Sequence, residues 1–440
     1  MIPYWSIATI DMASSGLIVG AATLIAANLI ITRELRNQMP ETLAALPVRA
    51  PARTRAAVLI TPLVTMVPVT AAILVQLTSL RVGTTVGAGR FDAYALVTGV
   101  VVVALSAVIG IALGRWLPTL IAPGIALFVL GAAMVLGLAA WLLPLVFVSG
   151  IPVELSRPSG WHLVYIVALV FLVGAVALLR HGPRPGPATI AAAATVFALG
   201  ATVLGGQGQH KAFAAASTQH CERRGEVTYC AFPPYVPWIG LWQQAVEPVV
   251  AAVPPAARHA LPEIRQRVYD WRRFPREKLA RPAVRPDQTW GRNGGETASR
   301  RILAAQVAAA VTGLPWDEMD SGGYLPTCDA RGQARTVVAL WLAEHVERQH
   351  LPSSIDTFNQ EGDRKIGSIP RSDMGWVDYG PAELGYARRL LADPGAERRI
   401  WAHWDVLTNP KSTVSQVIPL LGLSVQPASG RPPAGEEPCA

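Results

Sequence analysis

Charged side chains are scarce in this chain, and lysine is almost absent. Charged residues make up 15% of the 440 positions, and only four of the 38 basic residues are lysine. An ordinary soluble domain carries roughly 25% charged residues. Residues 1–210 hold eleven arginines, no lysine and five acids, whereas residues 211–440 hold 27 bases and 25 acids. The chain therefore has two parts of different composition, and the first is too poor in charge to be solvated by water.

The sequence also lacks the basic soluble face of a nucleic-acid-binding protein, although its pI is about 9.6. Such a face requires basic residues gathered on one soluble surface. Much of the basic excess here is arginine in short segments between apolar runs. We therefore expect no nucleic-acid partner.

Long stretches without any Asp, Glu, Lys or Arg dominate the first part. Six occur, at residues 13–32, 56–80, 93–114, 116–153, 158–179 and 185–209. Each reaches the roughly 20 residues with which a helix crosses a bilayer, and each is too long and continuous for a strand of a membrane barrel. The fourth contains Pro118, Pro123 and Pro144, so we count it as one crossing with a broken or re-entrant piece. The lipid bilayer is thus a predicted partner.

The expected fold is all-α. Residues 1–209 are predicted to form a bundle of about six transmembrane helices. Residues 210–425 are predicted to form a mostly α-helical extracytoplasmic domain with a small disulfide hairpin. Residues 426–440 are expected to be a flexible tail, because they are largely Pro, Gly, Ser and Glu. Apolar periodicity predicts helices at 237–253, 258–272, 296–313, 333–349, 381–392, 395–407 and 411–421, with loops at 274–295 and 351–376.

Arginines in the short loops predict the orientation of the bundle. One set of loops holds eight: Arg33, Arg36, Arg49, Arg53, Arg55, Arg115, Arg180 and Arg184. The alternate loops hold three: Arg81, Arg90 and Arg157. Because Lys and Arg concentrate in cytoplasmic loops, the first set is assigned to the cytoplasm and both chain ends to the outside of a plasma membrane.

Cysteine usage supports this orientation, because all four cysteines follow the last apolar stretch and disulfides persist in oxidising compartments. A two-residue turn at Gly225-Glu226 would pair Cys221 with Cys230 across a hairpin. Alternation places them at a non-hydrogen-bonded pair, where the Cα atoms are close enough for a disulfide. Two unpaired thiols are the alternative. The sequence does not decide whether Cys328 and Cys439 pair.

Aromatic residues gather just after the hairpin, at Phe232, Tyr235, Trp238 and Trp242. They either pack in the core of the domain or rest at the membrane interface, where Trp and Tyr concentrate. The apolar spacing of three and four residues along 237–253 favours the core.

Catalytic groupings are weak, so the sequence predicts neither an enzyme nor a cofactor. Cys328, His403 and Asp405 would suit a thiol triad of the transglutaminase kind, because Cys328 precedes a predicted helix whose N-terminus would lower the thiol pKa. Their wide separation in the sequence favours a structural cysteine instead.

Metal-binding patterns are equally weak. His345 and His350 are five residues apart and miss the four-residue spacing of a helical zinc site. The acidic run Asp317, Glu318 and Asp320 lacks the ligand repeat and glycine of a calcium loop. A solvated helix end and a solvated acidic turn explain these residues, and no metal is expected.

The loop between the first two apolar stretches contains a candidate docking helix. Pro40 can open it, Glu41 complements its positive N-terminus, and Pro47 ends it. Leu43 and Leu46 then share one face. Such a helix on a cytoplasmic loop either binds a soluble partner or belongs to a loop that only sets topology.

The sequence of this loop resembles that of the corresponding loop in the ABC-2 type transporter permeases. The resemblance lies in the acid-Thr-Leu-x-x-Leu-Pro run after an apolar span and in the basic run that follows. The resemblance covers the first 205 or so residues. It implies that a coupling helix contacts a separate ATP-binding subunit, and that the protein forms a dimer or hetero-oligomer. The residues that match are Glu34, Glu41, Thr42, Leu43, Leu46 and Pro47. The chain has no G-x-x-x-x-G-K-[ST] motif of its own.

The chain departs from that family in the position of the loop. In ABC-2 permeases the loop follows the second helix, whereas here it follows the first, as if one helix were missing. We expect either a start upstream of Met1 or a shortened relative. The segment from Cys221 to Trp238 is similar to the exported tails of bacterial ABC-2-like membrane proteins.

Three functions remain open. The first is a permease-like subunit of an ABC-2 type export system, energised by a separate ATP-binding subunit, which the run 41–47 supports. The second is a membrane-anchored extracytoplasmic binding or sensing protein, which the size of the second part supports. The third is a membrane-tethered thiol enzyme, which rests on Cys328 alone.

Overall fold

The computed structural model describes fourteen parts of the chain: residues 5–36, 50–82, 87–89, 91–135, 159–215, 219–266, 283–284, 290, 295–314, 327–347, 359–361, 364–370, 376–425 and 439. The chain divides into two compact units. The membrane unit comprises residues 3–85 and 89–217, and the C-terminal unit comprises residues 218–440 together with 1–2 and 86–88.

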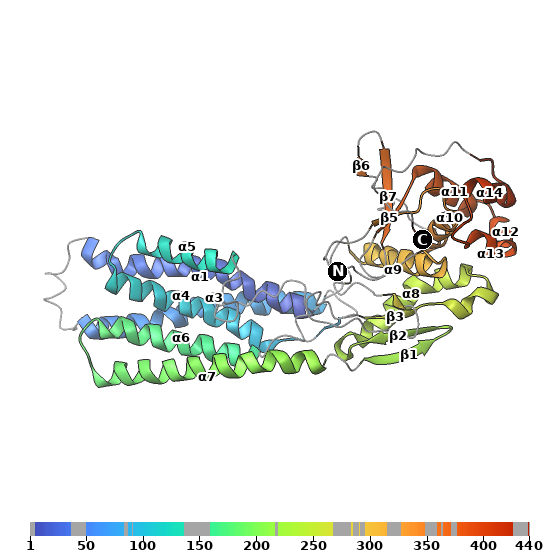
Figure 1. Ribbon diagram of the computed structural model, residues 1–440. Helices are drawn as coiled ribbons and strands as arrows, with labels where there is room; N and C mark the ends of the chain where they lie inside the picture. The colour runs from blue at the N-terminus through green and yellow to red at the C-terminus, as the bar shows by residue number, and fades with distance from the viewer. Residues whose placement is uncertain are drawn as a thin grey trace. The chain divides into compact units, whose positions relative to one another are not determined.

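The described segments of the membrane unit consist of helices and the short connections between them (Figure 1). Its helices are α1 (Trp5–Arg36), α3 (Ala50–Val82), α4 (Ala93–Trp116), α5 (Ala122–Val135), α6 (Ser159–Leu179) and α7 (Pro185–Ala215). Five are long and apolar enough to cross a membrane, whereas the apolar helix α5 is shorter. The chain is therefore a multi-pass membrane protein, as predicted. Residues 136–153 lie outside the described segments, so the single crossing assigned to the fourth stretch stays a prediction.

Helices α1 and α4 run in the same direction and contact each other along their length. Near their first turns, the ring of Trp5 packs edge-on against Phe91, with centroids 6.1 Å apart. Near their last turns, Gly114 lies against Ile31. The ends of α1 and α4 therefore lie at the same end of the membrane unit.

Glycines allow the backbones of α1 and α4 to touch. A Cβ added to Gly16 would lie 2.6 Å from the carbonyl oxygen of Gly99, and a Cβ on Gly99 would lie 2.7 Å from the Cα of Ala13. Neither distance leaves room for a side chain. Close approach through small residues is a common way to pack helices in lipid, where the hydrophobic effect does not drive association.

Helix α4 is the central helix of the membrane unit. Six residues on all of its sides are at most 3% exposed: Val102, Val103, Ala104, Leu105, Ala107 and Val108. Helix α3 is peripheral, since Leu59, Leu63 and Val67 are each at least 60% exposed. An apolar side chain that is exposed on such a helix faces lipid.

The C-terminal unit combines helices with two small sheets. Its helices, including the short 3-10 turns labelled η, are η3 (Pro233–Trp238), α8 (Ile239–Ala252), η4 (Pro255–Ala260), α9 (Gly295–Val311), α10 (Ala334–Glu344), η5 (His345–Glu347), α11 (Pro381–Ala392), α12 (Ala396–Ala402), α13 (Trp404–Leu407), α14 (Val414–Val417) and η7 (Ile418–Leu421). Its strands are β1 (His220–Arg224), β2 (Val227–Ala231), β3 (Glu263–Arg265), β4 (Ala283–Val284), β5 (Thr327–Asp329), β6 (Asn359–Glu361), β7 (Arg364–Pro370) and β8 (Trp376–Tyr379).

The two sheets are ordered β1-β2-β3-β4 and β5-β8-β7-β6. In the first, β1 and β2 form an antiparallel hairpin, and β3 and β4 add in parallel. In the second, β5 pairs in parallel with β8, while β7 pairs antiparallel with β8 and β6.

Helix α10 lies at the centre of the core of the C-terminal unit. All eleven of its residues are buried, including the charged Arg335 and Glu344. The aromatic residues after the hairpin are buried as well: Phe232, Tyr235, Trp238 and Trp242 are at most 6% exposed. The prediction that they pack in the core is confirmed.

The predicted helix at 258–272 is wrong. A 3-10 turn ends at Ala260, Leu261 is extended (φ −57°, ψ 135°), and β3 follows. Pro262 explains the break, because a proline pushes the residue before it out of the helical region. Ile264 of β3 instead pairs with Tyr229 of β2. The predicted loops are also partly wrong, since β4 lies in 274–295 and β6 and β7 lie in 351–376.

Candidate functional site

The membrane unit concentrates its arginines at one end. The ends of α1, α4 and α6 and the starts of α3 and α7 meet there, and they carry seven of the eight described arginines of the unit: Arg33, Arg36, Arg53, Arg55, Arg115, Arg180 and Arg184. Arg81, in the last turn of α3, lies at the opposite end. We call the end that carries the seven arginines the arginine end. The polypeptide leaves the membrane unit for the C-terminal unit from the opposite end, at the end of α7.

Specific contacts join the helices at the arginine end. The Thr54 hydroxyl of α3 lies 2.8 Å from Nε2 of His181, which follows α6. The Trp116 indole N–H donates to the Val176 carbonyl oxygen of α6 at 3.0 Å. The Arg180 guanidinium lies over the Trp116 ring, 5.8 Å from its centroid. Three helices are therefore fastened together beside the arginines.

The segment predicted to hold the coupling helix connects α1 to α3 in the sequence. Glu34 is in the last turn of α1, and its side chain is outside the described part of the structure. The other residues of the prediction, Glu41, Thr42, Leu43, Leu46 and Pro47, also lie outside the described segments. Their proposed contact with a partner stays a prediction, but the two helices that they connect, α1 and α3, end and begin at the arginine end.

The predicted disulfide hairpin is confirmed. Cys221 of β1 is opposite Cys230 of β2, their Cα atoms are 4.0 Å apart, and the two sulfurs are bonded. Gly225 occupies the turn with a φ of +60°, a conformation that glycine adopts without strain. Arg224 pairs with Val227, so the register is the predicted one.

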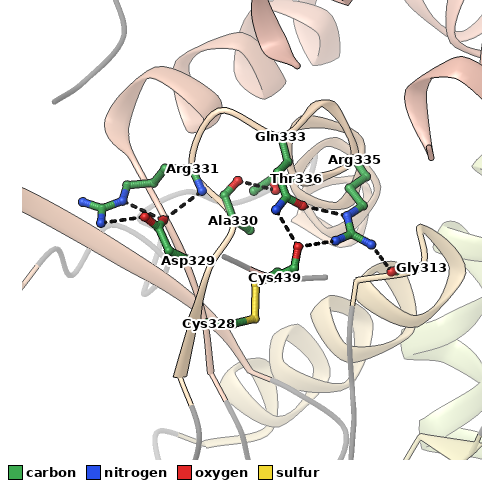
Figure 2. Close-up of a disulfide and its surroundings, with 9 residues drawn as sticks. All are labelled: Gly313, Cys328, Asp329, Ala330, Arg331, Gln333, Arg335, Thr336 and Cys439. Carbon is green, nitrogen blue, oxygen red and sulfur yellow. Dashed lines mark hydrogen bonds and ion pairs between the residues drawn. A yellow bond between two sulfur atoms is a disulfide. The ribbon is translucent and has the colours of Figure 1, made fainter. Parts of the chain in front are cut away.

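A second disulfide joins Cys328 to Cys439, across 111 residues (Figure 2). The Cys439 N–H donates to the Asp329 carbonyl oxygen at 2.9 Å. The Cys439 carbonyl accepts from Gln333 Nε2 at 2.8 Å and from Arg335 Nη2 at 2.9 Å. Residue 439 is therefore fixed against β5 and the start of α10. Residues 426–438 of the predicted flexible tail lie outside the described residues.

Arg335 is the centre of this cross-link. Its guanidinium is buried, and it also donates to the Gln333 side chain and to the carbonyl of Gly313, just after α9 (Figure 2). Burial lowers the pKa of Arg335 from its ordinary value. A charged donor held by several carbonyl groups makes stronger hydrogen bonds than a neutral one. The arrangement ties the end of α9, the start of α10 and residue 439 together.

The candidate thiol triad is not formed. Cys328 is disulfide-bonded to Cys439, so it is not a free thiol. His403 ends α12, and Asp405 is in the first turn of α13. The disulfide leaves the sequence-based hypothesis of a thiol enzyme without its nucleophile.

Of the candidate metal-binding residues, His345 lies in the described part of the structure. The Nδ1–H of His345 donates to the Trp341 carbonyl oxygen, 2.7 Å away, and the His345 ring packs edge-on against the Trp341 ring. His350, Asp317, Glu318 and Asp320 lie outside the described residues. Within the described part of the chain, three or more potential metal ligands nowhere gather.

Comparison with known proteins finds no matching family model, curated protein or solved structure. The family resemblance of the loop at 41–47 therefore gains no support from relatives. The structure is that of a multi-pass membrane protein with a disulfide-bonded C-terminal unit. The disulfides fit an extracytoplasmic location of that unit.

Proposed function

We propose that this protein is a permease-like membrane subunit of an ABC-2 type export system, energised by a separate ATP-binding subunit. One observation carries the proposal: the loop with the coupling-helix pattern connects α1 to α3 at the arginine end of the membrane unit. Arginine-rich ends lie in the cytoplasm, where ATP is available. Helix α7 begins at the arginine end, and the disulfide-bonded C-terminal unit follows the other end of this helix. An oxidising exterior on that side agrees with the disulfides.

Leu43 and Leu46 are the proposed apolar anchors of the contact. A short helix between Pro40 and Pro47 would place both on one face, which suits insertion into a groove of the partner. Burying one leucine contributes roughly 1.5 to 3 kcal/mol. Replacing both by aspartate should therefore weaken binding by about 100-fold or more, because roughly 1.4 kcal/mol corresponds to a factor of ten.

The test is co-purification with an ATP-binding subunit encoded beside this gene. The native chain is compared with Leu43→Asp/Leu46→Asp at equal membrane abundance. Asn37→Asp/Gln38→Glu is the matched control, because it adds two negative charges to the same loop and keeps both leucines. Loss of the subunit in the leucine variant alone supports the proposal, and unchanged recovery contradicts it.

A membrane-anchored extracytoplasmic binding protein is the second candidate. The observation that favours it is the construction of the C-terminal unit, which holds both disulfides around a core that includes the fully buried α10. A domain that is cross-linked to this degree suits a rigid receptor surface outside the cell. Unchanged recovery in the co-purification experiment would make this candidate the leading one.

A further inference from the structure

The contact between α1 and α4 changes character toward the arginine end. At Gly110, an added Cβ would clash with the Leu24 carbonyl oxygen, so backbone meets backbone there. One turn later, at Gly114, the nearest atoms to such a Cβ belong to side chains. They are Cγ2 of Ile31, at 3.0 Å, and Nδ2 of Asn28, at 3.4 Å. The side-chain amide of Asn28 is therefore held against a residue of α4 that has no side chain.

This amide has unused hydrogen-bonding capacity. Asn28 is 0% exposed, and neither its Nδ2 nor its Oδ1 has a hydrogen-bond partner among the residues that the structure describes. The group offers two N–H donors and one carbonyl acceptor. Leaving such a group unsatisfied is costly in a membrane interior, where bulk water does not reach it. Buried polar atoms in native proteins nearly always have a partner, so Asn28 is expected to have one.

The neighbouring side chains do not supply that partner directly. An asparagine in a membrane helix usually bonds to a polar side chain on the next helix, but Gly114 has none. Thr32 lies one turn after Asn28 on the same face of α1 and is 1% exposed. Its hydroxyl donates to the main-chain carbonyl oxygen of Asn28 at 2.9 Å, and its oxygen can still accept. The other residues packed at this position are apolar: Ala27, Ile31, Ile111 and Ala177.

We propose that the side chain of Asn28 binds an internal water molecule between α1 and α4, with the Thr32 hydroxyl oxygen as a second partner. A cation would satisfy the Oδ1 atom alone, and an anion would satisfy the Nδ2 atom alone. Water donates and accepts, so it suits both atoms, and an internal water typically makes two to four hydrogen bonds to groups of this kind.

The depth of the site allows this water to exchange with the cytoplasmic side. Asn28 precedes Arg33 by five residues in α1. With a rise of 1.5 Å per residue, the amide lies about 7.5 Å inward from that arginine along the helix. Gly114, on the other wall, directly precedes Arg115. The proposal does not depend on the ATP-binding subunit, since it concerns the packing of two helices of this chain.

Hydroxyl-radical footprinting of the full chain in lipid nanodiscs tests the site. X-ray pulses split water into hydroxyl radicals, so a side chain beside a bound water is oxidised even where bulk solvent does not reach it, and mass spectrometry locates the oxidised residues. Ile31 is only 6% exposed, but it borders the same position as the Asn28 amide and should be oxidised. Met12 is 1% exposed among apolar side chains and should stay unoxidised, although methionine is readily oxidised.

Two variants remove the water in different ways. Asn28→Leu replaces the amide by an apolar group of similar size and should abolish oxidation of Ile31. Gly114→Ala keeps the amide but places a methyl group 3.4 Å from its Nδ2, and it should abolish the oxidation as well. Persistence of the oxidation in Gly114→Ala would contradict a water held between the two helices.

Ser106→Ala is the matched control. It removes a polar group from the same helix pair, but the Ser106 hydroxyl already donates to the Val102 carbonyl oxygen at 2.9 Å. Oxidation of Ile31 should therefore stay at the native level in this variant. Absence of Ile31 oxidation in the native chain, or equal oxidation in the native chain and Asn28→Leu, would overturn the proposal. Oxidation of Met12 to the same extent would indicate general entry of solvent and would overturn it too.

Discussion

Removal of the Cys328–Cys439 disulfide should destabilise the C-terminal unit more than removal of the hairpin disulfide. The first bond closes 111 residues and the second closes nine. A cross-link stabilises mainly by restricting the unfolded chain, and the effect grows with the logarithm of the loop. That relation gives about 4.8 kcal/mol for the long loop and about 2.6 kcal/mol for the short one.

The perturbation is Cys328→Ser/Cys439→Ser, compared with Cys221→Ser/Cys230→Ser, so that no odd thiol remains in either variant. Pulse proteolysis of the full chain in detergent across a urea series measures unfolding of the C-terminal unit. With a urea dependence of about 2 kcal/mol per molar, the midpoint should fall by about 2 M in the first variant and about 1 M in the second.

The structure adds a local reason for the larger effect. Without its sulfur bond, residue 439 is held among the described residues by the hydrogen bonds with Asp329, Gln333 and Arg335. When those bonds open, the buried Arg335 guanidinium loses an acceptor, which adds a desolvation cost. Equal midpoint shifts in the two variants, or a larger shift in the hairpin variant, would refute the reasoning from loop length.

Three other outcomes are expected. Gly99→Val should lower the thermal stability of the membrane unit by about 1 to 3 kcal/mol through overpacking, whereas Gly200→Val, which meets nothing within 4 Å, should leave it nearly unchanged in a detergent melting assay. Arg335→Met should lower the urea midpoint of the C-terminal unit, because each carbonyl left unpaired costs about 1 to 3 kcal/mol; an unchanged midpoint would count against its cross-linking role. Thr42→Cys and Val82→Cys should label with impermeant reagents from opposite sides of the membrane, and labelling of both from outside would disprove the topology.

The features that sequence predicted well are local. The hairpin register follows from a two-residue turn, so the pairing of Cys221 with Cys230 needed only the residues between them. The apolar stretches predicted the membrane helices for a similar reason, since composition over one span decides whether it can enter lipid. The helices α9, α10 and α11 were found because each has its own apolar periodicity.

The features that sequence missed depend on distant partners. Cys439 is 111 residues from Cys328, and four cysteines allow several pairings. The contact between Thr54 and His181 spans 127 residues and has no local signal. Strand β3 looked helical by periodicity, and its pairing with β2 and β4, far away in the sequence, stabilises its extended conformation. Pro262 was the one local sign that a helix could not pass through this segment.

The direct backbone contact between α1 and α4 limits how the membrane unit can change shape. Sliding of the two helices past each other is opposed, because the Gly99 carbonyl lies against Gly16 and the Ala13 backbone lies against Gly99. We therefore expect α1 and α4 to behave as one rigid helix pair. Helix α3 is different, since lipid covers much of its surface and Pro62 and Pro68 interrupt its hydrogen bonding. Bending is therefore easier in α3, at these two prolines, than in the α1–α4 pair, to which the segment 37–49 connects it in sequence.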